Sequence, residues 1–168
     1  IDVTGANNPP IIVDGNFSPT DTLTYTTPED QAITICITAI DLDGDTLDIT
    51  GIFGGPVNGS ANGIADGDTC FTYTPNPDWN GSDTVNVIVC DNNGGCDTVL
   101  VIIDVTPVTD PPIIIDGGDP VDTLNTTTPQ DIPIVICLDA IDVDGDTLDV
   151  TGVVDPPGNG TVSGIADG

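Results

Sequence analysis

Hydrophobic and polar residues alternate along short stretches of this chain, and clusters of Gly, Pro, Asn and Asp separate these stretches. Successive side chains of an extended strand point to opposite faces, so the alternation predicts β-strands with one buried face. We expect strands at residues 11–13, 22–26, 32–39, 46–53, 57–63, 69–74, 83–90 and 96–105. About seven strands in roughly 100 residues predict an all-β fold of the immunoglobulin-like β-sandwich kind.

The same pattern returns in the second half of the chain. Residues 39–48 recur almost unchanged as residues 140–149, at an offset of 101 residues (140 − 39). We expect residues 1–8 to be the end of a preceding repeat and its linker, residues 9–110 to be a complete repeat, and residues 111–168 to be the first part of a second repeat. A repeat of this length predicts that the chain is one part of a longer tandem array.

The charge of the chain excludes several classes of function. It contains 28 acidic residues and no Lys, Arg or His, for a formal net charge of −28 at pH 7. Binding to nucleic acid requires basic residues, anionic membrane surfaces repel an acidic chain, and no apolar run is long enough for membrane insertion. Catalysis through Ser-His-Asp, Cys-His or a Schiff base is excluded as well. We therefore expect no enzyme; the alternative is a hydrolase that uses paired carboxylates of the loop at residues 41–45.

The alternation also predicts how the cysteines pair. Cys36, Cys70, Cys90 and Cys96 all fall on the predicted outer faces of their strands. A bridge through the core from Cys36 to Cys90 would need inward-facing cysteines, so bridges within a sheet fit better. Cys90 and Cys96 flank the tight turn at residues 91–95, and we expect them to form one disulfide while Cys36 and Cys70 form the other.

The fifth cysteine explains the odd count. Cys137 is the counterpart of Cys36 in the second repeat, and its partner is expected beyond Gly168. Disulfides indicate an oxidising compartment, which favours an extracellular or cell-surface location. A zinc site is a weaker alternative because ligands at CxxC spacing do not occur in the sequence.

Each repeat contains an acidic loop with carboxylates at alternate positions around a glycine. The loops comprise Asp41, Asp43 and Asp45 in the first repeat and Asp142, Asp144 and Asp146 in the second. Alternate side chains point to one side, so the carboxylates repel one another unless a cation or water separates them. Oxygen ligands favour a hard cation, and calcium is the ion expected. The loop is not an EF-hand, and the alternative is a solvated acidic turn.

Several motifs occur in a fixed order over essentially the whole chain: residues 27–30 (TPED), 39–45 (AIDLDGD), 58–60 (NGS), 73–84 (YTPNPDWNGSDT) and 105–112 (VTPVTDPP). With these motifs the chain resembles the cadherin-like tandem repeats of large bacterial cell-surface adhesins. The resemblance implies β-sandwich repeats of cadherin type, strung in arrays with calcium at the junctions.

The resemblance also implies which residues bind calcium. At the junction between the two repeats the matching positions are Glu29, Asp91, Asp110, Asp142 and Asp144. Asp41 and Asp43 would serve the preceding junction, with Asn8 as the linker residue. Two departures from the family pattern imply weaker binding or fewer ions: the linker at residues 109–111 has few Asn and Asp residues, and Gln130 takes the place of Glu29.

Asp-Thr-aliphatic tripeptides recur along the chain and resemble the acceptor motif of a bacterial O-glycosylation system. The acceptors would be Thr22, Thr46, Thr84, Thr98, Thr123 and Thr147. The strand phasing places these threonines on outer faces, where a glycan could be accommodated. The alternative is ordinary strand alternation with an Asp at the start of a strand.

Together these features predict an extracellular structural repeat protein, a calcium-stiffened filament or adhesin stalk. Its expected partners are other copies of the same chain or repeats, and surface glycans or cells. The alternative is a carbohydrate-binding surface module, for which Trp79 would be a stacking platform. A lone aromatic residue before a turn more often closes the end of a sandwich core, and that interpretation is favoured.

Overall fold

A computed structural model describes residues 5–64 and 67–165 of the chain. The chain divides into two compact units, unit 1 (Ile1–Val108) and unit 2 (Thr109–Gly168). This division falls two residues before the expected boundary after Asp110. The described residues contain β-strands and no helix, so the predicted all-β class is confirmed.

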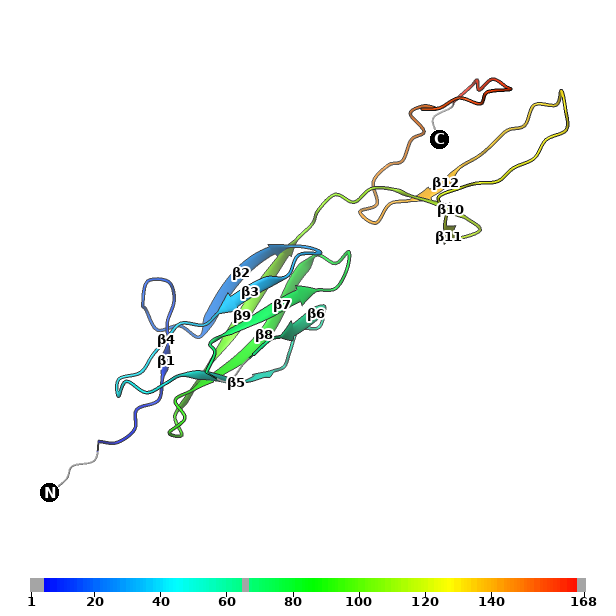
Figure 1. Ribbon diagram of the computed structural model, residues 1–168. Helices are drawn as coiled ribbons and strands as arrows, with labels where there is room; N and C mark the ends of the chain where they lie inside the picture. Colours follow the sequence, from blue (N-terminus) through cyan, green and yellow to red (C-terminus); the bar gives the residue numbers. More distant parts are fainter. Residues whose placement is uncertain (1–4, 65–66, 166–168) are drawn as a thin grey trace. The chain divides into compact units, whose positions relative to one another are not determined.

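Unit 1 has a strand in every region where the alternation predicts one (Figure 1). Its strands are β1 (Ile11–Ile12), β2 (Thr22–Pro28), β3 (Ile33–Cys36), β4 (Ala39–Ile40), β5 (Asp48–Phe53), β6 (Gly59–Asn62), β7 (Cys70–Pro75), β8 (Gly81–Cys90) and β9 (Cys96–Thr106). The expected strand at residues 32–39 is broken into β3 and β4. The backbone changes partners between the two strands. The N–H of Ile37 donates to the carbonyl of Thr69, just before β7, whereas the carbonyl of Thr38 accepts the N–H of Val13, just after β1.

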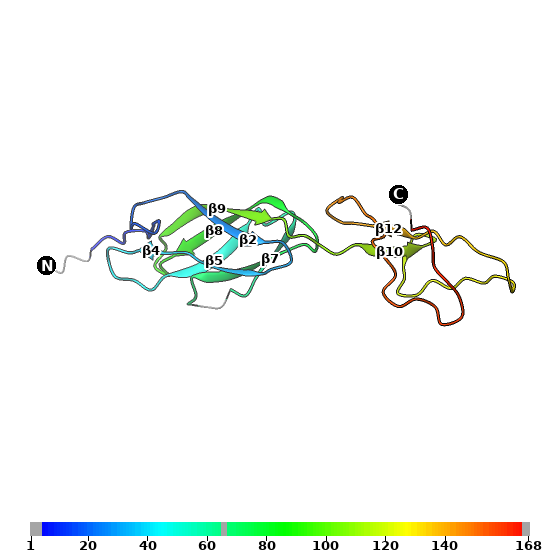
Figure 2. The same ribbon diagram turned by 90° about the horizontal axis from the view of Figure 1, so that it is seen from above.

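Two sheets pack face to face in unit 1 (Figures 1 and 2). The larger sheet has the strand order β2-β9-β8-β5 and the smaller sheet has the order β3-β7-β6, while β1 and β4 form a separate pair. β2 runs parallel to β9, and the other neighbouring strands are antiparallel. The direction of β9 therefore fixes which end of the unit each loop occupies.

The core of unit 1 lies between the two sheets. Alternate residues of β8 and β9 supply its larger wall, and β3 and β7 supply the opposite wall. Its most buried members are Ile12, Ile35, Phe71, Tyr73, Val85, Val87, Val89, Val99, Val101 and Ile103. Burial of such side chains stabilises a fold by about 1.5–3 kcal/mol each.

Both predicted disulfides are present. Cys36 of β3 lies directly opposite Cys70 of β7, and the two are bonded. Cys90 and Cys96 close the hairpin between β8 and β9. The residues before or after these cysteines point into the core, which confirms the outward phasing. Cys137 is an exposed free cysteine.

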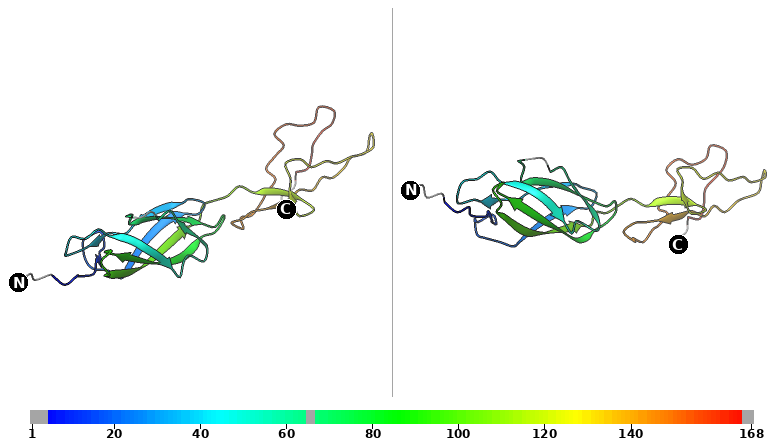
Figure 3. Two further views of the ribbon diagram at one scale, coloured as in Figure 1. Left: turned by 60° about the horizontal axis from the view of Figure 1, so that its bottom comes forward. Right: turned by 90° about the horizontal axis from the view of Figure 1, so that it is seen from below.

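Unit 2 has a small sheet and long irregular segments (Figure 3). Its strands are β10 (Ile113–Asp116), β11 (Asp119–Pro120) and β12 (Asp139–Ile141), in the order β11-β10-β12. β10 pairs with β12 as β1 pairs with β4: Ile113 faces Ile141 where Ile11 faces Ile40. The sequence repeat is therefore also a structural repeat at this pair of strands.

Candidate cation site in the acidic loops

The acidic loop of unit 1 follows β4 directly, so its first residue starts from a fixed strand end. Oδ1 of Asp41 accepts the backbone N–H of Asp43 at 2.8 Å and of Asp45 at 3.2 Å. Gly44 has a φ of 79°, a left-handed conformation that glycine adopts without steric cost. This turn gathers the three aspartates, with one carboxylate oxygen from each within 4.8 Å of the others.

The residues before β1 are held against this loop. The backbone N–H of Asn8 donates to Oδ2 of Asp43 at 2.7 Å, and its side-chain Nδ2 donates to the same oxygen at 3.1 Å. Two prolines, Pro9 and Pro10, follow and restrict the backbone between Asn8 and β1. The structure therefore places Asn8 beside Asp43 of this loop, and calcium binding by Asp41 and Asp43 stays a prediction.

The second acidic loop has the same geometry within unit 2. Oδ1 of Asp142 accepts the N–H of Asp146 at 3.1 Å, and Gly145 has a φ of 77°. Oδ2 of Asp144 accepts the N–H of Asp110 at 2.8 Å, as Asp43 accepts that of Asn8. Carboxylate oxygens of the three loop aspartates lie within 4.8 Å of one another here too. Local sequence thus builds one arrangement twice. It includes Asp45 and Asp146, the third aspartates of the two loops, which the resemblance had not placed among the ligands.

One oxygen of the first loop is left without a partner. Oδ2 of Asp41 is buried and has no hydrogen-bond partner among the described residues. A buried carboxylate oxygen that is left unpaired is costly, and the chain has no Lys, Arg or His that could neutralise it. An oxygen-only cluster with a buried unpaired carboxylate oxygen is the ligand chemistry that a hard cation requires.

Asp91 does not lie where the resemblance placed it. It is 1% exposed, and Oδ2 accepts a 2.7 Å bond from Nδ2 of Asn7. Asn7 is the chain neighbour of Asn8, so Asp91 lies at the same end of unit 1 as Asp43. Sequence reasoning missed Asn7, although the Asn-Asn pair before two prolines was visible.

Strand direction explains this correction. β9 begins beside the turn that contains Asp91 and runs from Cys96 to Thr106, about 30 Å at the rise of a strand. Pro28 is paired with Thr106, so Glu29 follows at the far end of β9. Asp91 and Glu29 therefore cannot bind one ion together.

Glu29 has a structural role at that far end. It is 3% exposed, Oε1 accepts the backbone N–H of Val108 at 2.6 Å, and Nδ2 of Asn80 donates to Oε2 at 3.5 Å. These contacts fix the backbone that leaves β9. Each of the implied ligands is thus located: Glu29 at the exit of unit 1, Asp91 at its entry, and Asp110 with Asp142 and Asp144 in unit 2.

The surroundings of Asp91 predict how stability depends on pH. Burial opposes its ionisation, but hydrogen bonds from the side chain of Asn7 and the backbone of Asn93, Gly95 and Gly94 outweigh burial and lower the pKa below 3.8. The pKa of Asp91 is lower in the folded than in the unfolded chain. Ionised Asp91 therefore stabilises unit 1 above pH 3.8, and this contribution disappears as the pH falls through the folded pKa.

Asp91→Asn should therefore flatten the fall in unfolding free energy below pH 3.8, measured by urea titrations at several pH values. Asp104→Asn makes the same charge change at an exposed position of β9 and is the control. An Asp91→Asn chain whose acid profile parallels that of the parent would contradict the expectation.

All six threonines of the Asp-Thr-aliphatic tripeptides are exposed. At two of these sites the aspartate also has a structural role. Asp97 accepts the backbone N–H of Ile12 at 2.8 Å, and Asp83 is buried and accepts several hydrogen bonds. These roles account for the aspartate at the start of a strand without a glycan, and glycosylation stays a prediction.

Trp79 packs against the core of unit 1 and is partly buried. A Cβ placed on Gly81 would lie 3.1 Å from Cζ2 of the indole, so this glycine lets the backbone pass close to the ring. The ring fills the edge of the core, as the favoured interpretation expected.

Solved structures that resemble parts of the chain have low similarity. A nucleoside hydrolase-related hypothetical protein from Saccharophagus degradans, associated with carbohydrate metabolism, shares 17% identity at a TM-score of 0.48, over 60% of this chain and 26% of its own. An endo-fucoidan hydrolase from glycoside hydrolase family 107 shares 19% identity at a TM-score of 0.41, over 53% of this chain and 13% of its own. The chain spans about a quarter or less of either protein. None of the curated proteins compared with the chain matches it.

The described residues contain no helix long and apolar enough to cross a membrane. The sequence profile of the family described as bacterial Ig domain matches residues 7–104, more than half of the chain and all strands of unit 1 up to most of β9. This match confirms the immunoglobulin-like resemblance. The chain therefore belongs to the bacterial Ig domain family, whose members are typically extracellular or displayed on the cell surface.

Proposed function

We propose that the protein is an extracellular, non-enzymatic structural repeat protein, a filament or adhesin stalk that calcium stiffens. The observation that carries this proposal is the repeated acidic loop, in which a residue before the first strand bonds the second aspartate in both units. Membership of the bacterial Ig domain family supports the extracellular part. Its partners would be other copies of the same chain or repeats, and surface glycans or cells.

The residues of the first loop fit a calcium ion. Calcium takes six to eight oxygen ligands at about 2.3–2.6 Å. Asp41, Asp43 and Asp45 each offer one carboxylate oxygen within 4.8 Å of the others. The amide of Asn8 now donates to Asp43; a half-turn of this amide would present its oxygen instead. Water would complete the coordination.

Calcium at this position would stiffen the chain where it enters each repeat. Asn8 is separated from β1 only by Pro9 and Pro10, which restrict the backbone. An ion bound by both Asn8 and the loop would add its coordination bonds to the existing hydrogen bond and fix the direction of the linker. Asp110 and the loop of Asp144 would do the same in unit 2.

The exposure of the acidic loops favours ion binding over carboxylate-pair hydrolysis. A general acid needs a carboxyl group whose pKa is raised by an apolar environment. Asp43, Asp144 and Asp146 are exposed to solvent. Solvated carboxylates suit a cation that keeps part of its water shell.

Calcium should stabilise unit 1. Extracellular calcium modules have dissociation constants of about 0.1–1 mM, so 10 mM calcium should add about 1.4–2.7 kcal/mol to the free energy of unfolding. The melting temperature of unit 1, followed by the fluorescence of its only tryptophan, should rise on adding calcium and fall on adding a chelator. Magnesium should do less because it gives up its water reluctantly.

Controls must separate ion binding from screening of the −28 charge. Sodium chloride at matched ionic strength measures screening alone. Asp41→Asn with Asp43→Asn should abolish the calcium-specific part, whereas Asp21→Asn with Asp104→Asn, the same charge change at exposed positions, should preserve it. An equal response of both variants, or a calcium effect no larger than that of sodium, would show that the loop is a solvated turn.

A further inference from the structure

β2 is the longest strand of unit 1 that ends a sheet (Figure 1). It stands first in the order β2-β9-β8-β5, and β9 is its only partner among the described strands. Its seven residues, Thr22–Pro28, include no acid although the chain has 28. A free strand edge invites pairing with another strand, and proteins usually block such edges with charges, bulges or short strands.

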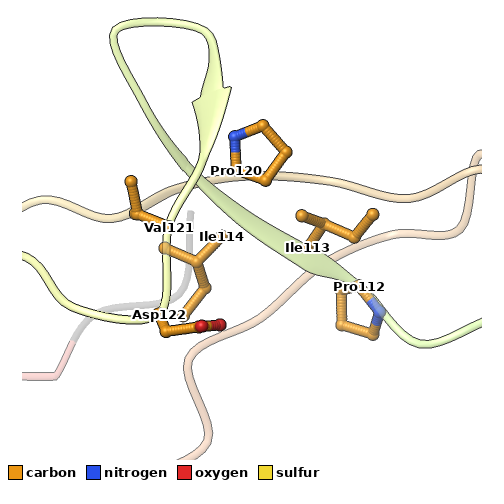
Figure 4. A pocket seen from close by; sticks show the side chains of 6 residues that line it. All are labelled: Pro112, Ile113, Ile114, Pro120, Val121 and Asp122. Carbon is orange, nitrogen blue, oxygen red and sulfur yellow. The ribbon is translucent and has the colours of Figure 1, made fainter.

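The other sheet edges of unit 1 have this protection. β5 begins with Asp48 and has a register shift between Ile49 and Gly51, and β3 and β6 have four residues each. The groove beside β10 in unit 2 is not an edge, because β10 has a partner on each side. Side chains line this groove, including Ile114 and Val121 (Figure 4). β2 is therefore the open strand edge of unit 1.

The hydrogen bonds to β9 show which backbone groups of β2 are directed away from the sheet. The N–H of Leu100 donates to the carbonyl of Asp21 at 3.0 Å, and the N–H of Glu29 donates to the carbonyl of Thr106 at 2.9 Å. Every second residue of a strand bonds a given neighbour, so the odd-numbered residues of β2 bond β9. The even-numbered residues direct their N–H and C=O groups to the open edge.

The two ends of this edge are closed, and its centre is open. The hydroxyl of Thr20 donates to the carbonyl of Thr22 at 2.7 Å and accepts the N–H of Thr22 at 3.2 Å. Pro28, at the other end, has no N–H. Between them, Thr24 and Thr26 are exposed, and no hydrogen bond within the described residues uses their outward backbone groups.

We propose that a second copy of this chain pairs with the open edge, β2 against β2 in antiparallel direction, with Tyr25 of both copies on a two-fold axis. The proposal rests on the proposed function for the class of partner, another copy of the chain. Thr24 of each copy lies opposite Thr26 of the other, and the two pairs exchange four N–H···O bonds. The larger sheets of the two copies join into one continuous sheet.

This register fits the closed ends of the edge. It places Thr22 opposite Pro28 of the other copy, and the carbonyl that this proline cannot bond is the one that Thr20 already satisfies. An axis through Thr24 would place Thr26 opposite Thr22, whose backbone groups are occupied. An axis through Thr26 would place Thr24 opposite Pro28 and leave a carbonyl without a donor. The match between a missing donor and an occupied acceptor favours a second copy as the occupant.

The side chains across the contact are compatible as well. The hydroxyl of Tyr25 donates to the carbonyl of Cys36 at 3.1 Å, which fixes the ring beside the axis. Aromatic pairs and threonine pairs across strands stabilise antiparallel sheets. Asp21 lies opposite Glu29 of the other copy, but Glu29 is 3% exposed and its carboxylate accepts the N–H of Val108 in its own copy. The wider repulsion between two acidic chains is screened by salt.

The test uses the whole chain as Cys137→Ser, so that free thiols cannot join two copies. Sedimentation in about 1 M sodium chloride, where the screening length is about 3 Å, should show a monomer–dimer equilibrium. Amide exchange at Thr24 and Thr26 should slow as the protein concentration rises. Exchange at Leu23 and Tyr25 should stay unchanged, because their N–H groups already bond β9.

A proline variant and a matched control test the edge. Thr24→Pro removes two of the four bonds by symmetry and leaves the bonds to β9 in place, so it should weaken dimerisation at least about tenfold. Ala61→Pro is the control on the free edge of β6. The N–H of Asn76 donates to the carbonyl of Asn58, so Ala61, an odd number of positions further on, is directed away from β7. This variant should dimerise like the parent, and the fluorescence of Trp79 checks that both variants are folded.

The outcomes separate this contact from the calcium-stiffened stalk. A chain that stays monomeric in high salt, a dimer that Thr24→Pro leaves intact, or slowed exchange at other residues but not at Thr24 and Thr26 would each overturn the proposal. Calcium has no part in the contact, so a chelator should leave the dimer unchanged. A chain that dimerises through β2 but lacks calcium-specific stabilisation would support this contact and contradict only the stiffened stalk.

Discussion

Replacement of Cys36 and Cys70 by serine should lower the free energy of unfolding of unit 1 by about 3–4 kcal/mol. The bond joins residues 34 apart in sequence, so its loss releases a long loop in the unfolded chain. It also joins β3 to β7 across the smaller sheet. Urea unfolding followed by the fluorescence of Trp79, the only tryptophan of the chain, reports on unit 1 specifically.

The second disulfide provides the comparison. Cys90 and Cys96 are six residues apart, and removal of their bond should cost about 2 kcal/mol because the loop it closes is short. Both double variants should be made with Cys137→Ser, so that the free thiol cannot exchange. If the hairpin variant loses as much stability as the Cys36 and Cys70 variant, loop length does not govern the effect and the chain-entropy account fails.

Asp83→Ala should destabilise unit 1 by about 3–5 kcal/mol, because one buried and three partly buried hydrogen bonds would lose their acceptor at once. The carboxylate of Asp83 accepts the backbone N–H groups of Val57, Asn58 and Thr84 at 2.9–3.0 Å and the hydroxyl of Tyr73 at 3.2 Å. Burial, with the charge of Asp83 beside it, raises the pKa of Tyr73 far above its usual range, so the hydroxyl remains a donor.

Graded substitutions test this account. Asp83→Asn keeps one acceptor oxygen but turns an NH₂ group toward the remaining donors, and it should cost less than alanine. Tyr73→Phe removes only one donor and should cost about 1 kcal/mol as a lost hydrogen bond. Asp104→Ala, at an exposed position of the neighbouring strand, should change stability by less than about 0.5 kcal/mol. Equal effects of Asp83→Ala and Asp104→Ala would remove Asp83 from the structural network.

The acidic-loop site was predictable to the extent that its parts are local. Asp41, Asp43 and Asp45 converge because a turn around Gly44 binds the backbone to the first carboxylate, and this needs only the loop itself. The repeat in the sequence predicted a second such turn around Gly145 for the same reason. Asn7 was missed because its partner, Asp91, is 84 residues away in sequence.

The sequence by itself determined the strands of unit 1 and their inner and outer faces, since an alternation of period two places each side chain without reference to distant residues. It also predicted the cysteine pairing, because outward-facing cysteines do not fit a bridge through the core and Cys90 and Cys96 flank a tight turn, which leaves Cys36 for Cys70. Only the tertiary structure decided which end of unit 1 each loop occupies. That depends on the direction of β9. Asp91 lies in the turn before this strand begins, and Glu29 lies beside the end of the strand, because Pro28 pairs with Thr106.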